Sequence, residues 1–366
     1  MKAAILYEVG KPLAVESIEV EGPRAGEVLV RYAAAGVCHS DHHVMVGIIP
    51  APTPIILGHE GAGVVEEVGA GVTSVKPGDH VVSVWRYSCG ACEPCLSGRP
   101  ATCGHGAQMR AGGVLSDGTT RFKKGRERVH HWLGVSTFSS HSVMSERSVL
   151  KIRDDMPLEK AAVVSCAVIT GVGAVINGAK VRPGESVAVF GAGGVGLNAI
   201  QGARLVGAEP IIAVDIMQGK LDYARKFGAT HTVNSSDENP VERIKEITGG
   251  KGVHYAFEMI GVAEVMATAF RCLRTGGAAV VVGIADSKSV ISINPVPLVT
   301  EEKRLIGSLY GSSSPRLEVP RLIDLYMAGK LNLDDLLTRS WPIEQINEAY
   351  GALLRGEVAR SVVTYS

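Results

Sequence analysis

The pattern of apolar and polar residues changes near the middle of the chain. Up to about residue 165, short apolar runs alternate with Gly, Pro and Asp, a pattern typical of β-strands joined by tight turns. The clearest of these runs cover residues 2–7, 27–31, 63–68 and 80–84. This part of the chain is therefore predicted to be β-rich and barrel-like.

After residue 170, apolar strands alternate with helices. The pattern predicts strands at residues 187–190, 211–214, 253–257 and 278–282, and helices at 197–206 and 221–227. Strand–helix–strand repeats of this length build parallel sheets, so the predicted fold class is α/β with a doubly wound sheet. A helix at 316–328 and a tail at 360–365 follow, and the tail is expected to return to the β-rich part.

Composition excludes several classes of function. The 366 residues suffice for two domains, and 46% hydrophobic with 20% charged residues is typical of a soluble globular protein. Lys plus Arg equals Asp plus Glu at 37 each, which argues against nucleic-acid and membrane partners. We see no apolar run of about 18 residues and no signal peptide, so we expect a cytoplasmic protein. Its seven cysteines should then stay reduced.

A glycine-rich turn predicts a dinucleotide site. Gly191, Gly193 and Gly196 form a G-x-G-x-x-G pattern directly after an apolar strand, with Gly194 and Val195 opening the next helix. The glycines permit a tight turn and close approach to a pyrophosphate, and the helix N-terminus offers unpaired N–H groups. A glycine turn without a ligand is the alternative interpretation.

Asp215 specifies which dinucleotide would bind. It ends the second strand of this part of the chain. A carboxylate there can accept both hydroxyls of the NAD ribose and would repel the 2′-phosphate of NADP. The sequence therefore predicts NAD.

Four cysteines lie close together in the β-rich part. Cys89, Cys92, Cys95 and Cys103 have the spacing C-x2-C-x2-C-x7-C. Four thiolates on one loop can close a tetrahedron around Zn²⁺ with no open position, which is a structural site. Disulfides are disfavoured in a reducing compartment, and the bacterial iron–sulfur pattern spaces its last cysteine differently. Cys272, in an apolar helix, is expected to be core.

Three further residues are candidates for a second zinc site. Two thiolates and an imidazole, from Cys38, Cys166 and His59, would leave the fourth zinc position open, as catalytic sites require. Taken singly, each could equally be a buried thiol or a hydrogen-bonded histidine. The residue types alone leave this site undecided.

Taken together, these features resemble the zinc-dependent medium-chain alcohol dehydrogenase family, in particular its class III-like bacterial branch, over essentially the whole chain. Besides the cysteine loop, the matching stretches are residues 36–41, 58–63, 134–138, 190–197 and 214–215. The resemblance implies a GroES-like catalytic domain from residues 1–167 and 310–366. It implies a Rossmann NAD-binding domain from residues 168–309.

The same resemblance implies one structural and one catalytic Zn²⁺ per chain. Cys38, His59 and Cys166 stand where the family holds its catalytic metal. Glu60 matches an acidic neighbour that can approach the metal, and Asp41 matches the carboxylate that orients the histidine ligand.

Proton transfer and cofactor binding are implied in the same way. Ser40 matches the first hydroxyl of a proton relay and His43 its outer end, where an imidazole can exchange protons at neutral pH. The adjacent His42 is a competing candidate. Contacts to the pyrophosphate, ribose and nicotinamide are implied for His39, Thr170, Val195, Lys220, Val282 and Arg360.

The substrate channel of the family corresponds here to apolar residues, namely Ile49, Trp85, Trp132 and Leu133. Such a lining predicts a hydrophobic substrate body, and Trp85 near the metal would favour primary over secondary alcohols. The implied function is NAD-linked oxidation of a primary alcohol to its aldehyde. A homodimer or homotetramer is expected, paired through edge strands near residues 290–294.

Other functions remain open. Glutathione-dependent formaldehyde dehydrogenases share the size and inserted loop of this chain. However, Ala107 stands where they carry a carboxylate-binding arginine, residues 47–54 lack their acidic residues, and His43 replaces their common tyrosine. A zinc-free quinone or enone reductase on the same fold would not need the three catalytic ligands. A non-enzymatic metal or redox sensor would not need the NAD motif.

Overall fold

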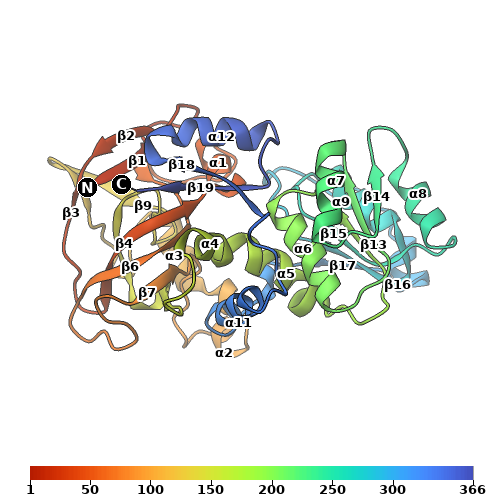
Figure 1. Cartoon of the computed structure of the whole chain (residues 1–366), viewed down its shortest axis with the longest axis horizontal. Helices are drawn as coiled ribbons and strands as arrows, with labels where there is room; N and C mark the ends of the chain where they lie inside the picture. Colours follow the sequence, from red (N-terminus) through yellow and green to blue (C-terminus); the bar gives the residue numbers. More distant parts are fainter. Residues whose placement is uncertain (366) are drawn as a thin grey trace. The chain divides into compact units, whose positions relative to one another are not determined.

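The computed structural model describes residues 1–365, and the chain divides into two compact units (Figure 1). The first unit combines Met1–Cys166, Ser314–Gly329 and the residues from Leu333 onward. The second unit combines Ala167–Ser313 with Lys330–Asn332. Each unit contains its own β-sheet structure.

The first unit is built on two β-sheets. The larger has the spatial order β11 (Val149–Lys151), β7 (His80–Ser83), β6 (Glu60–Val68), β4 (Glu27–Gly36), β19 (Arg360–Thr364) and β18 (Leu337–Pro342), with β10 (His141–Ser145) also paired to β4. The other has the order β2 (Ala14–Ser17), β1 (Lys2–Leu6), β5 (Ile55–Ile56), β9 (Glu127–His131), β8 (Phe122–Lys124) and β3 (Glu19–Val20). As expected, the C-terminal tail returns to this unit, where β19 lies antiparallel to β4.

Short helices connect and cover these strands. They are α1 (His39–Met45), α2 (Glu93–Leu96), α3 (Gly104–Gly112), α4 (Leu158–Val163), α11 (Pro315–Met327) and α12 (Ile346–Leu354), with 3-10 turns η1 (Pro100–Thr102), η2 (Glu146–Ser148) and η6 (Ile343–Gln345). The sequence predicted α11 to within one residue. Helix α12 buries one face, because its apolar residues recur at helical spacing.

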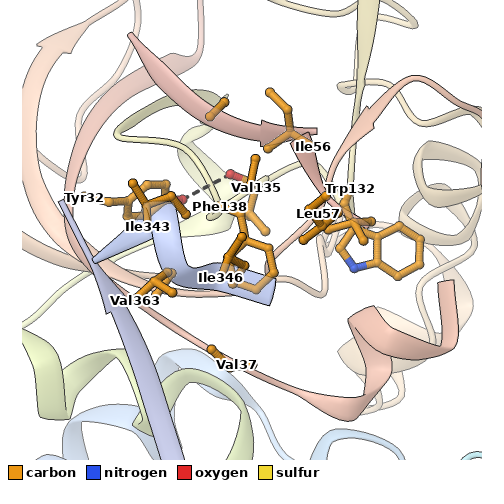
Figure 2. Close-up of a cluster of buried hydrophobic side chains, with 14 of the residues drawn as sticks. Tyr32, Val37, Ile56, Leu57, Trp132, Val135, Phe138, Ile343, Ile346 and Val363 are labelled. Carbon is orange, nitrogen blue, oxygen red and sulfur yellow. Dashed lines mark hydrogen bonds between the residues drawn. The ribbon is translucent and has the colours of Figure 1, made fainter. Parts of the chain in front are cut away.

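The core of the first unit lies between strands, loops and α12. Figure 2 shows Tyr32 of β4 beside Val135 and Phe138, with Ile346 of α12 in the same cluster. The Tyr32 hydroxyl donates a hydrogen bond to the Val135 carbonyl at 3.1 Å, which satisfies the polar end of a buried ring.

The second unit contains one parallel sheet. Its order is β14 (His231–Asn234), β13 (Ile211–Asp215), β12 (Val187–Phe190), β15 (Val253–Glu258), β16 (Leu273–Val281) and β17 (Arg304–Gly307). Its helical segments are α5 (Ile169–Gly173), α6 (Gly194–Leu205), α7 (Gln218–Phe227), α8 (Pro240–Ile247), α9 (Ala263–Arg271), α10 (Val296–Thr300) and the 3-10 turn η5 (Tyr310–Ser312).

This sheet confirms the predicted α/β fold class. Every position of β12 and β13 is buried, as in central strands of a parallel sheet covered on both faces. The predicted strands match β12, β13 and β15 to within one residue, whereas β16 starts earlier than predicted. Cys272 is fully buried, as expected.

One sequence prediction about apolar runs is wrong. Leu158–Ala179 is a helical stretch of 22 residues, long and apolar enough by length and composition to cross a membrane. It combines α4 and α5 with the π-helical segments η3 (Val164–Val168) and η4 (Ala174–Ala179), so Cys166 lies within a helix. Because 78% of its most apolar window is buried inside the protein, the stretch is a core helix.

The segment expected to pair two subunits has no strand partner among residues 1–365 of this chain, and its pairing with a second subunit stays a prediction. Residues 290–294 form no strand in the structure, since no neighbouring strand of the chain pairs with their backbone. The edges of the parallel sheet are β14 and β17.

Candidate metal centres and dinucleotide site

The four cysteines of the predicted structural site converge. The Sγ atoms of Cys89, Cys92, Cys95 and Cys103 all lie within 4.8 Å of one another. Cys92 Sγ is 3.4 Å from Cys95 Sγ and 3.8 Å from Cys103 Sγ, and all four thiols are free. Zn–S bonds of about 2.3 Å place the sulfurs of a tetrahedron about 3.8 Å apart, so this spacing suits zinc.

Backbone N–H groups favour thiolates in this cluster. The N–H groups of Ala91 and Cys92 donate to Cys89 Sγ at 3.5 and 3.3 Å, and Cys89 N–H donates to Cys103 Sγ at 3.4 Å. The bonds from Ala91 and Cys92 lower the pKa of the Cys89 thiol to about 6. Thiolate is the form that binds zinc, so the donor set fits a closed structural site.

A second cluster gathers residues from three parts of the first unit. Cys38 precedes α1, His59 precedes β6, and Cys166 lies in the π-helical segment η3. One ligand atom each from Cys38, His59, Glu60 and Cys166 lies within 4.8 Å of the others, and all four residues are buried. The structure thus brings together the three candidate ligands, Cys38, His59 and Cys166, that the residue types alone left undecided.

Asp41 orients the imidazole of His59. Its Oδ1 accepts hydrogen bonds from His59 Nδ1 at 3.0 Å and from the Gly58 N–H at 3.1 Å. With the Nδ1 proton directed at Asp41, Nε2 keeps its lone pair for a metal. Gly58 has a φ of +82°, and a Cβ there would lie 2.6 Å from Phe138 and Thr137, so glycine is required where the chain turns into β6.

Electrostatics in this cluster favours a divalent cation. The pKa of Cys38 is held well below its usual range by a hydrogen bond from Cys166 and by His59, and the same bond, with burial, raises the pKa of Cys166. Burial opposes the charged form of His59, but Asp41 and Cys38 raise its pKa. Protons shared among buried sulfurs and a ring nitrogen are those that Zn²⁺ displaces on binding. The residues therefore fit a three-ligand zinc site.

Glu60 and Arg360 form a buried ion pair beside this cluster. Arg360 Nη2 donates to Glu60 Oε2, and Glu60 Oε1 lies 4.0 Å from His59 Nε2. Burial raises the pKa of Glu60 to about 7, although Arg360 opposes the rise. Arg360 is only 3% exposed, and its predicted contact with a pyrophosphate stays a prediction.

The residues predicted for proton transfer lie on α1. Ser40 Oγ is 3.7 Å from Cys38 Sγ, which places its hydroxyl beside the cluster. His42 and His43 are half-buried, and burial lowers the pKa of both. His39 is exposed. The relay itself stays a prediction.

Of the predicted substrate residues, Trp85 lies against His59. Its ring centroid is 5.5 Å from that of His59, in an edge-on arrangement. Trp132, 2% exposed and visible in Figure 2, and Leu133 are part of the buried core, and Ile49 packs against that core. The substrate role of all four residues stays a prediction.

Arg86 is a residue that the sequence did not single out. Its guanidinium carbon lies 5.0 Å from the centroid of the Trp85 ring, within range of a cation–π interaction. The only signal in the sequence was its position after Trp85.

The glycine turn between β12 and α6 has the geometry that the motif predicts. Gly191 has a φ of +95°, and a Cβ at Gly196 would lie 1.8 Å from the Gly191 carbonyl oxygen. Gly193 precedes the helix and offers no side-chain cap to its first N–H groups. These donors are therefore available to a phosphate.

Asp215 lies beside this turn. Its Oδ2 accepts the Ala192 N–H at 2.8 Å and its Oδ1 accepts the Met217 N–H at 3.1 Å. A carboxylate has about four lone-pair sites, so both oxygens can still accept ribose hydroxyls. The second unit also holds the other predicted cofactor residues Thr170, Gly194, Val195, Lys220 and Val282.

Two family profiles match the chain. The alcohol dehydrogenase GroES-like domain covers residues 24–154, and the zinc-binding dehydrogenase covers residues 194–328. The first match contains the four-cysteine loop, Cys38 and His59. The second contains Gly196 and Asp215.

Several known proteins are similar over their full length. S-(hydroxymethyl)glutathione dehydrogenase from Paracoccus denitrificans is 42% identical over 373 residues, which cover 100% of this chain and 99% of that protein. The structure of an alcohol dehydrogenase zinc-binding domain protein from Burkholderia ambifaria has a TM-score of 0.95 at 38% identity, covering 99% of this chain and 98% of that one. Benzyl alcohol dehydrogenase from Acinetobacter calcoaceticus has a TM-score of 0.95 at 34% identity, covering 100% and 99%.

Proposed function

Because the chain belongs to the zinc-dependent medium-chain alcohol dehydrogenase family, we propose that it catalyses the NAD-linked interconversion of a primary alcohol and its aldehyde. The observation that carries this proposal is the convergence of Cys38, His59 and Cys166 in one buried cluster. Zn²⁺ held there would supply a Lewis acid for the alcohol oxygen, and NAD would accept the hydride.

The chain's own residues prepare this chemistry. Asp41 fixes the tautomer and the orientation of His59. The Ser40 hydroxyl, beside Cys38, takes the proton that the alcohol loses and gives its own proton to the next group of the relay. His43, half-buried on the same helix, passes the proton to solvent.

The choice of NAD rests on the turn that opens α6. Free N–H groups after Gly193 bind the pyrophosphate, and Asp215 accepts the ribose hydroxyls. The negative charge of Asp215 repels a 2′-phosphate, which disfavours NADP.

Trp85 restricts the substrate at its reacting carbon. Its ring lies against His59, so a second alkyl group on that carbon would meet the indole. The reacting group is therefore a –CH2OH. Two kinds of substrate body satisfy this requirement, an apolar one and a thiol-linked one.

The thiol-linked candidate is S-(hydroxymethyl)glutathione, the substrate named for the relative that is 42% identical. This adduct is also a primary –CH2OH compound, with carboxylates on its peptide body. Arg110 follows Ala107 by three residues on α3, so both side chains lie on one face of that helix. Arg110 is half-buried, and among the described residues no carboxylate pairs with its guanidinium, so it can hold a substrate carboxylate in place of the arginine missing at Ala107.

The test is NAD reduction by the zinc-loaded enzyme with primary alcohols of rising length, benzyl alcohol, a secondary alcohol, and formaldehyde mixed with glutathione. For an apolar body, kcat/KM should rise by up to about 4-fold per added methylene, which is the hydrophobic gain of about 0.8 kcal/mol. For the adduct, kcat/KM should exceed that of every alcohol and fall about 10-fold or more in Arg110→Ala.

A matched control is Arg128→Ala, which removes an exposed arginine from β9. It should change kcat/KM neither for the alcohols nor for the glutathione adduct. The proposed reaction is refuted if enzyme containing two zinc ions per chain reduces NAD with none of these compounds. Full turnover by Cys38→Ser enzyme would refute the catalytic role of the cluster.

A further inference from the structure

Several buried polar atoms near the three-ligand cluster have no hydrogen-bond partner among the described residues. Two of them are Asp41 Oδ2 and the hydroxyl oxygen of Tyr350, while Glu60 Oε1 and Arg360 Nε belong to the buried ion pair described above. Asp41 is fully buried and Tyr350 is 3% exposed. Buried polar atoms are nearly always hydrogen-bonded, to protein or to internal water, so a donor and an acceptor that both lack a partner call for an explanation.

Tyr350 packs onto the helix that carries Asp41. It lies on the buried face of α12, and its ring centroid is 6.2 Å from that of His42, the residue after Asp41 on α1. Phe138 holds the ring from another side, edge-on at 6.2 Å. These contacts fix the ring in place.

Electrostatics also connects the two groups. Burial is the largest cause of the raised pKa of the Tyr350 hydroxyl. Among the charged groups that also raise this pKa, Asp41 has the largest effect, ahead of Cys38 and Glu60. A hydroxyl that keeps its proton can donate a hydrogen bond, and a buried carboxylate can accept one.

We propose that Tyr350 is a positioning residue whose hydroxyl holds Oδ2 of Asp41 through one internal water molecule, which accepts from the hydroxyl and donates to the carboxylate. Oδ1 of the same carboxylate holds His59 and Gly58. With both oxygens engaged, the carboxylate cannot rotate, and the His59 ring keeps the orientation that its Nδ1 hydrogen bond to Asp41 sets. This inference rests on the proposed zinc-binding role of His59.

Removing the hydroxyl should loosen the metal and leave the fold intact. In Tyr350→Phe, the ring packing stays, but the water molecule at Oδ2 of Asp41 loses the hydroxyl that holds it. Loss of outer partners of metal ligands typically costs 10- to 100-fold in metal affinity. Because Tyr350 acts through Asp41, we expect the lower end, on the order of 10-fold faster zinc release from the Cys38 cluster.

The experiment measures zinc release from the holoenzyme into excess chromogenic chelator. Zinc release from the four-cysteine cluster provides an internal reference phase. The Cys38→Ser variant lacks one ligand of the other cluster, so the phase that it leaves unchanged is the reference phase. Tyr350→Phe should accelerate only the phase of the Cys38 cluster. Cobalt(II) substituted into that cluster should show a shifted visible spectrum, because the His59 ring is less firmly oriented.

Tyr32→Phe is the matched control. It also removes a buried tyrosine hydroxyl from the first unit, but this hydroxyl donates to the Val135 carbonyl and not to Asp41. It should lower the urea concentration at the midpoint of unfolding and leave the rate of zinc release unchanged. In an Asp41→Ala background, Tyr350→Phe should have no further effect, because the carboxylate that it holds is gone.

An unchanged release rate in Tyr350→Phe would overturn the inference, as would equal acceleration in Tyr32→Phe or an additive effect in the Asp41→Ala background. These failures differ from failure of the proposed function. If Cys38→Ser protein still retains two zinc ions per chain with full turnover, the proposed zinc site is wrong, whatever Tyr350 does.

Discussion

At the scale of single residues, Trp85 decides how much room surrounds the reacting carbon. Its indole lies edge-on against His59 at 5.5 Å. In Trp85→Ala, the ratio of kcat/KM for a secondary alcohol to that for the matching primary alcohol should rise about 10-fold or more, as removal of a steric contact of 1–3 kcal/mol allows. The measurement is NAD reduction with a primary and a secondary alcohol of equal carbon number.

Trp85→Phe is the control for this prediction, since it keeps a flat ring beside His59. It should leave the ratio within about 3-fold of the original value, which is less than 1 kcal/mol. An alanine variant with the original ratio would show that Trp85 does not limit substrate branching.

At the same scale, local patterns in the sequence identified candidate ligands by type, and only the family resemblance assigned Cys38, His59 and Cys166 to one site. Cys89, Cys92, Cys95 and Cys103 lie close together in the chain, so their spacing alone predicted a cluster. Cys38 and Cys166 lie far apart, and only folding brings their sulfurs together. Tyr350 carried no signal, because a tyrosine among apolar helical positions looks like any core residue.

At the scale of elements, the turn from β12 into α6 tolerates no side chain at Gly196. In Gly196→Ala, the new Cβ would lie 1.8 Å from the Gly191 carbonyl oxygen, so strand and helix must separate. We expect a loss of about 1–3 kcal/mol in stability and of tenfold or more in NAD affinity. Fluorescence titration with NAD and urea unfolding measure the two effects.

Gly219→Ala is the matched control, because a Cβ in this exposed part of α7 has nothing within 4 Å. It should stabilise the protein by up to about 1 kcal/mol, the helix preference of alanine, and leave NAD affinity unchanged. Equal NAD affinity in Gly196→Ala would contradict the role of the turn.

The environment of the helical stretch Leu158–Ala179 depends on the rest of the fold and not on its own sequence. An apolar helix of this length could lie in a membrane or in a core, and its sequence is compatible with both. Its burial inside the protein decides for the core. Cys166 lies in a π-helical segment of this stretch, a feature that hydrophobic periodicity does not reveal.

At the scale of the whole molecule, His131 links stability to pH. It is fully buried, stacks on Phe122 at 4.3 Å and accepts the Arg121 N–H at Nε2, and burial lowers its pKa to about 3. Between pH 6.5 and 3 the unfolded chain binds a proton that the folded chain does not. The contribution of His131 to the free energy of unfolding is therefore fully present above pH 6.5. It falls with pH, by about 1.4 kcal/mol between pH 7.5 and 5.5.

His131→Gln should remove this part of the acid sensitivity while keeping an acceptor for Arg121. Urea unfolding of the zinc-loaded proteins at pH 7.5 and 5.5 tests it, with His231→Gln, which changes an exposed histidine, as the control. If His131→Gln and the original protein lose equal stability over this interval, His131 is not the group responsible.

The sequence by itself determined the α/β class, the glycine turn, Asp215 and the four-cysteine loop, because each depends on periodicity or spacing within a short segment. Only the tertiary structure decided that Cys38, His59 and Cys166 meet, that Arg360 pairs with Glu60, and that Trp132 lies in the core. The physical reason is that burial and metal geometry are properties of distant segments packed together, and no local pattern specifies which distant side chains share a site.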